Sequence, residues 1–99
     1  MSNQQQDLPS IYIPHVSQWA TKYYIKNIFN KLNWGIIQKI YIYHKKSYNQ
    51  IFIDFSTWHI NNPQTTIIRN KLLEGKTINV MHDYPWFWKC SKSFYKKRC

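Results

Sequence analysis

Acidic residues are scarce in this chain. Its 99 residues include four Asp and Glu against 14 Lys and Arg, which gives a formal net charge of +10. Such an excess of positive charge implies a polyanionic partner. A competing explanation is compositional, because the abundant Ile, Lys, Asn, Tyr and Phe have A/T-rich codons. That bias does not explain why acids are so few, and we therefore expect nucleic acid as the partner.

Glycine and cysteine are rare as well, with two of each. Gly35 and Gly75 lie far apart and form no phosphate-cradling loop, and neither paired carboxylates nor a nucleophile beside a base form a recognisable motif. We therefore expect no catalysis and no cofactor. Cys90 and Cys99 have no histidine at metal-ligand spacing, which predicts free thiols in a reducing compartment and no metal site.

The first 21 residues contain no Lys or Arg and lack the apolar run of a signal peptide or membrane helix. We expect an intracellular protein, located in the cytoplasm, the nucleus or a virion, without a membrane partner. No linker divides the chain, so we expect one core. We divide it into a polar tail (1–9), a folded domain (10–82) and an aromatic, basic extension (83–99).

A short strand and a helix are predicted first. Residues 11–13 form a β-prone run that Pro14 should end, because proline cannot donate to a sheet ladder. Thr21 can cap the helix, and Gly35 suits the chain reversal after it. The helix carries one apolar stripe at a 3.6-residue period, made of Ile25, Ile28, Phe29 and Leu32.

Two alternating segments then predict an antiparallel pair of strands. In IIQKIYIYHKK, Ile40 and Ile42 face a core, and the opposite side carries Lys39, Tyr41 and Tyr43. In YNQIFIDFS, residues 48–56, the inward residues are Ile51, Ile53 and Phe55, and the outward ones are Gln50, Phe52 and Asp54. One side of this pair is apolar and the other is rich in aromatic rings.

A second helix and a further strand complete the domain. Asn62 followed by Pro63 is a helix start, Gly75 supplies the stop, and the apolar face between them is imperfect. In TINVM, residues 77–81, Ile78 and Val80 alternate inward. The order β-α-β-β-α-β predicts an α+β, ferredoxin-like sandwich, with a four-stranded antiparallel sheet and two helices on one face.

These segments resemble the RNA-recognition motif family over about residues 11–81. IYIPHV is similar to the family's six-residue motif, with Tyr12 at the stacking position, and LLEGKTINV is similar to its approach to the fourth strand. YNQIFIDF stands in the place of the eight-residue motif. There Phe52, Ile53 and Phe55 agree, whereas Tyr48, Asn49 and Gln50 depart from the pattern.

The resemblance implies that Tyr12 and Phe52 project from the uncovered sheet face as platforms for stacked bases. Tyr41 and Tyr43 share that face and can extend the platform, and Gln50 can bond a base edge. The alternative is that Tyr12 and Phe52 pack under the C-terminal segment. Cross-strand packing likewise accounts for the two tyrosines.

The C-terminal segment DYPWFWKCSKSFYKKRC has no standard counterpart in that family. Its rings are interleaved with cations, as single-stranded nucleic acid requires. Two alternatives remain: an extra edge strand or a cover over the sheet, and an aromatic contact for a protein partner. The aromatic residues are Tyr84, Trp86, Phe87, Trp88, Phe94 and Tyr95.

We expect a non-catalytic protein that binds single-stranded RNA through the sheet face and the basic tail. The alternative is a structural or adaptor protein that uses the same fold for protein contacts, for example in a viral particle. The A/T-biased composition and small size are similar to those of small proteins from large DNA viruses. The expected contact residues are Tyr12, Phe52, Gln50, Tyr41, Tyr43, Lys39, Lys45, Lys46, Trp86, Trp88, Lys89, Lys92, Lys96, Lys97 and Arg98.

Overall fold

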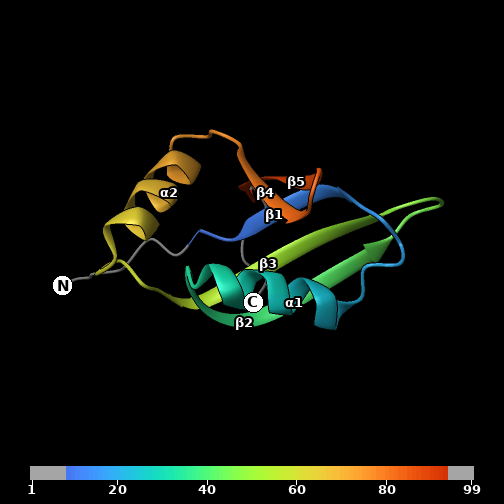
Figure 1. Ribbon diagram of the computed structural model, residues 1–99, viewed down its shortest axis with the longest axis horizontal. Helices are drawn as coiled ribbons and strands as arrows, with labels where there is room; N and C mark the ends of the chain where they lie inside the picture. The colour runs from blue at the N-terminus through green and yellow to red at the C-terminus, as the bar shows by residue number, and fades with distance from the viewer. Residues whose placement is uncertain (1–8, 94–99) are drawn as a thin grey trace.

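The computed structural model describes residues 9–93. They form an α+β fold with two helices and one five-stranded antiparallel sheet, in the order β2-β3-β1-β5-β4 (Figure 1). The elements are β1 (Ile11–Val16), α1 (Lys22–Leu32), β2 (Gly35–His44), β3 (Asn49–Trp58), α2 (Pro63–Leu73), β4 (Ile78–Asp83) and β5 (Trp86–Lys92).

Helix α1 begins at the predicted cap but ends differently from the prediction. The Thr21 side chain accepts a hydrogen bond from the Tyr24 N–H at 3.1 Å. The chain reverses at Asn33, which is left-handed (φ 56°), and Gly35 is already the first residue of β2. Gly35 is needed for another reason: a Cβ there would collide with the Thr57 carbonyl oxygen of β3.

Helix α2 follows its predicted signals at both ends. The Asn62 side chain accepts from the Gln64 and Thr65 N–H groups, Pro63 opens the helix, and Gly75 follows its end with φ 85°. Its apolar face is as weak as the sequence indicates, because Leu72 and Thr65 are its buried residues while Ile67 is exposed. α2 therefore depends on a small contact area against β4 and β5.

The hydrophobic core lies on one face of the sheet, and both helices contribute to it. Ile25 and Phe29 of α1 and Leu72 of α2 join the same buried cluster. Figure 1 shows α1 along β2, with α2 standing apart from it near β4. Of the predicted inward residues of the strands, Ile40, Ile51, Ile53, Phe55 and Val80 are buried there as well, and Ile42 and Ile78 pack against the cluster partly buried.

Strand β1 continues through Pro14, whereas the sequence predicted that it ends there. Ile13 pairs with Ile51 and Val16 pairs with Asn49, so β1 advances three residues while β3 advances two. The extra residue makes a β-bulge, one of the places where a strand tolerates a proline. The bulge turns β1 at the point where it leaves its other neighbour, β5.

The sheet has a fifth strand where four were expected. β5 pairs with β1 on one side and with β4 on the other, so the strand after α2 lies at the sheet edge and not beside β1. Trp88 and Cys90 of β5 point into the core. Residues 86–92 of the expected extension thus form an inner strand, and burial of these side chains is the physical reason.

Candidate nucleic-acid interface

The face of the sheet opposite the helices carries the side chains that alternate with the core residues. We call it the open face. Along β2 and β3 the register places Tyr41 directly opposite Phe52, and Tyr12 of β1 is opposite Phe52 on the other side. The members of the open face are Lys39, Tyr41, Tyr43, Gln50, Phe52, Asp54, Tyr12, Phe87, Lys89, Ser91, Asn79 and Met81.

The centre of the open face is a packed ring cluster. The Tyr12 and Phe52 rings are stacked with centroids 4.8 Å apart, and the Tyr43 ring meets Phe52 edge-on at 5.4 Å. Gln50 Nε2 donates to the Tyr12 hydroxyl at 3.2 Å. Phe52 is only 5% exposed, Tyr12 is partly buried, and Tyr43 is 44% exposed. Tyr43 therefore offers the most accessible ring of this cluster.

Lysines flank the cluster along β2. Lys39 Nζ lies 5.1 Å from the centroid of the Tyr41 ring, a cation–π distance. Lys39 is also paired in register with Asp54, which accepts a hydrogen bond from the Ser10 hydroxyl at 2.5 Å. Asp54 is the one acid among the described residues of β1, β2 and β3.

The β2–β3 hairpin extends past the rest of the sheet (Figure 1) and carries two further exposed lysines. The Lys45 N–H donates to the Tyr48 carbonyl at 2.8 Å and closes the turn. Gln18 Nε2 donates to the Lys45 carbonyl at 3.1 Å, which ties the turn to the segment before α1. Lys45 and Lys46 thus project from a held turn at one end of the open face.

The expected tail residues are divided between core and surface. Trp88 is 4% exposed and belongs to the core, so its ring is not on the surface, whereas Trp86 is 65% exposed. Lys89 is exposed on the open face; Lys92 is partly buried and alternates to the helix side. The remaining expected contacts, Lys96, Lys97 and Arg98, lie outside the described residues.

Phe87, which the sequence analysis named among the rings of the C-terminal segment, was left out of the expected contact set, and so was Met81. Phe87 is 45% exposed and is paired with the exposed Met81 on β4. The alternation in WFWKC could have found it, because burying Trp88 and Cys90 directs Phe87 and Lys89 to the other side. His15 was missed as well; the bulge turns its ring onto Tyr48, with centroids 4.6 Å apart.

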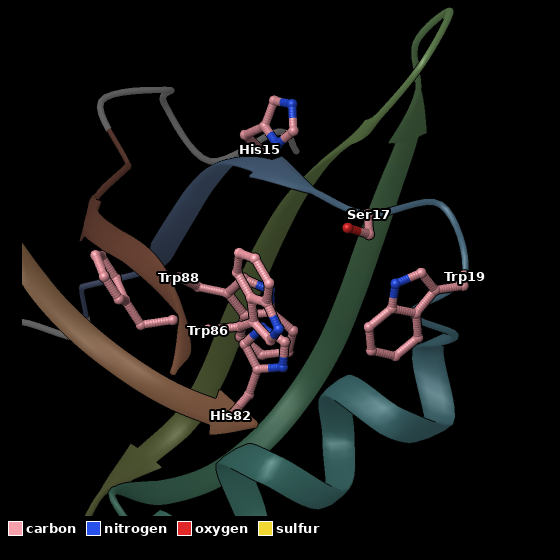
Figure 2. A pocket seen from close by; sticks show the side chains of 7 residues that line it. His15, Ser17, Trp19, His82, Trp86 and Trp88 are labelled. Carbon is pink, nitrogen blue, oxygen red and sulfur yellow. The ribbon is translucent and has the colours of Figure 1, made fainter. Parts of the chain in front are cut away.

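A pocket of about 490 Å³ opens beside the bulge of β1 (Figure 2). We call it the split pocket, because it lies where β1 separates from β5. Its lining comes from β1, the segment before α1 and the β4–β5 hairpin, and comprises His15, Ser17, Trp19, His82, Trp86, Phe87 and Trp88. None of these residues except Trp86 and Trp88 was in the expected contact set.

A ring stack organises the split pocket. His82 lies flat on Trp88, with centroids 4.1 Å apart, and the Tyr24 hydroxyl is 2.9 Å from His82 Nδ1. Trp19 meets Tyr24 edge-on at 5.0 Å. Burial lowers the pKa of His82, partly offset by the charge of Asp83; burial and that same charge raise the pKa of Tyr24. Both groups are therefore neutral near pH 7.

Metal and thiol chemistry find little support in the described region. Residues 9–93 contain no group of three or more His, Cys, Asp or Glu side chains that could hold a metal ion. Cys90 is a free thiol, and burial raises its pKa to about 12. Cys99 lies outside the described residues.

Across 9–93, no helix has the length and apolar character needed to cross a membrane.

Comparison with known proteins returned no match to any family model, to any curated protein or to any solved structure.

Proposed function

We propose that this protein binds single-stranded nucleic acid, RNA in the first instance, across the open face of its sheet. The observation that carries the proposal is the arrangement of that face, where accessible rings alternate with lysines and Asp54 is the one acid of β1, β2 and β3. Rings stack on bases of any sequence, and lysines neutralise phosphates. The net charge of +10 also attracts a polyanionic strand over long range.

The accessible groups lie on both sides of the packed centre. Tyr43 is on β2, and Phe87 and Lys89 are on β5. A strand that crosses the sheet therefore meets Lys39 and Tyr43 at one side and Phe87 with Lys89 at the other. The proposal keeps the binding face that the RNA-recognition motif family implies, but moves the contacts outward from Tyr12 and Phe52.

Fluorescence anisotropy with labelled single-stranded oligonucleotides tests the proposal. Lys89→Gln is expected to weaken binding and to reduce the slope of log K against log salt by about 0.7, the value for one lost phosphate contact. Lys71→Gln on α2 is the matched control, because it removes the same charge from an exposed position on another element.

The ring contacts have their own pair of variants. Phe87→Ala is expected to lower affinity roughly tenfold, since base stacking contributes about 1 to 3 kcal/mol per base. Tyr23→Ala removes an exposed ring from α1 and is expected to leave affinity unchanged. Equal effects at Phe87 and Tyr23 would contradict a face-specific contact. A chain that forms a stable oligomer and ignores oligonucleotides at moderate salt would support the adaptor alternative.

A further inference from the structure

We propose that the split pocket receives one unstacked nucleobase from the strand bound on the open face. The inference deepens the proposed function and rests on it. It concerns a site at the bulge of β1 that lies away from the ring cluster of Tyr12 and Phe52.

The opening comes from the way β1 leaves β5. The two strands pair only at Ile11 with Lys92 and at Tyr12 with Ser91. Beyond Tyr12 comes Pro14, which has no N–H to donate, and the bulge carries β1 away toward β3. The sheet is therefore interrupted between its central strand, β1, and β5, and side chains from both strands line the resulting hollow.

The exposed rings of the split pocket suit a planar ligand. Trp19 is 58% exposed and Trp86 is 65% exposed, while His82 and Trp88 are already stacked on each other. Figure 2 shows Trp19 on one side of the pocket, with Trp86, His82 and Trp88 on the other. At about 490 Å³ the pocket is within the usual range of small-molecule sites and can hold a base with part of its sugar.

Polar groups are available for the edge of a base. The Ser17 hydroxyl points toward the rings in Figure 2, and His15 lies above them. His82 is held by Tyr24 at Nδ1, and within residues 9–93 its other ring nitrogen, Nε2, has no protein hydrogen bond. A hydroxyl and a neutral imidazole nitrogen can each donate to or accept from a base edge.

A second hollow adjoins the split pocket on the side of the open face. It measures about 250 Å³ and is lined by Pro14, His15, Phe87 and Lys89. His15 and Phe87 belong to both linings. Lys89 is thus placed to hold a phosphate while the attached base turns into the split pocket, which favours a nucleotide within a strand as the occupant.

Charge argues against the other ligand that aromatic pockets commonly take. Quaternary ammonium groups bind in aromatic cages, but the lining of the split pocket has no acidic residue. One acid, Asp83, acts on His82 and Tyr24 from outside the lining, and it is countered by Lys89 of the adjoining hollow and by the chain's net charge of +10. This balance favours a nucleotide, which carries negative phosphate, over a quaternary ammonium cation.

The decisive experiment uses oligonucleotides that carry one 2-aminopurine, a base whose fluorescence is quenched by stacking. With the wild-type protein we expect quenching at one position of the bound strand. Trp86→Ala should abolish that quenching and lower affinity roughly tenfold. The slope of log K against log salt, to which Lys89 contributes, should not change in this variant. Trp86 is the right target because its ring is exposed; Tyr23→Ala is the matched control and should keep the quenching.

The outcomes separate the two proposals. If the wild type binds the strand but Trp86→Ala changes neither quenching nor affinity, the split pocket is not a base site and the open-face proposal stands. If the wild type fails to bind any oligonucleotide, both proposals fall. In ¹H–¹⁵N spectra, a saturating single-stranded oligonucleotide should shift the indole N–H signals of Trp19 and Trp86; unshifted signals with the strand bound would also overturn the inference.

Discussion

The centre of the open face and the split pocket are both built from aromatic rings, but they use them in opposite ways. At the centre, Tyr12, Phe52 and Tyr43 pack on one another, and Phe52 is almost fully buried. In the split pocket, Trp19 and Trp86 keep large exposed surfaces. The difference follows from strand pairing, because regular register brings rings together across strands, and the bulge of β1 removes the neighbour that would cover Trp86.

The largest expected difference between the centre of the open face and the split pocket is in how much each ring contributes to the free energy of unfolding. Phe52→Ala is expected to lower the free energy of unfolding by about 3 to 5 kcal/mol, because it removes a buried ring and leaves a cavity. Trp86→Ala should cost about 0.5 kcal/mol or less, as is usual for an exposed position. Urea unfolding measures both. A cost at Trp86 as large as that at Phe52 would break the contrast between a structural and an available ring.

Tyr24→Phe tests whether the stack of the split pocket is held by its hydrogen bond. Loss of the hydroxyl is expected to lower the free energy of unfolding by about 0.5 to 1.5 kcal/mol, since it removes the partner of His82 Nδ1 at 2.9 Å. The neighbouring exposed ring provides the control, and Tyr23→Phe should have no effect in the same urea titration. Equal values for the two variants would show that the hydroxyl of Tyr24 does not hold the stack.

The smallest effect expected is a dependence of stability on pH that originates in the split pocket. Burial lowers the pKa of His82 below 6.5 in the folded chain, so the unfolded chain binds this proton first as pH falls. The contribution of neutral His82 to the free energy of unfolding is complete above pH 6.5, and it is lost as the pH drops toward the pKa of His82 in the folded chain. His82→Phe keeps a ring on Trp88 but removes the titratable group. The variant should therefore show a smaller change of stability with pH in thermal unfolding between pH 7.5 and about 5. An unchanged profile would place the effect elsewhere.

The local elements could largely be predicted because their signals are local. Thr21 and Asn62 cap their helices through their own side-chain oxygens, and the alternation in YNQIFIDFS places Ile51, Ile53 and Phe55 in the core. Pro14 was misjudged for a physical reason: the missing N–H matters only if the strand is regular there, and the partner strand decides whether a bulge forms.

The site was harder to predict than the fold, since exposure depends on distant neighbours. Phe52 and Trp88 were both expected as contacts, yet one is packed between tyrosines and the other lies in the core. Trp19 and His82 belong to segments far apart in sequence, and only the β4–β5 hairpin brings them to one pocket. No periodicity within either segment carries that information.

By itself, the sequence determined which side chains alternate, where both helices begin, and that the chain carries a strong positive charge, because each of these depends on composition or on neighbours a few residues away. The tertiary structure alone decided that residues 86–92 become the inner strand β5 and that β1 parts from it at a bulge. These outcomes depend on burying Trp88 and Cys90 against residues far along the chain, such as Phe29. That long-range packing also left Trp86 and Trp19 exposed beside the opening.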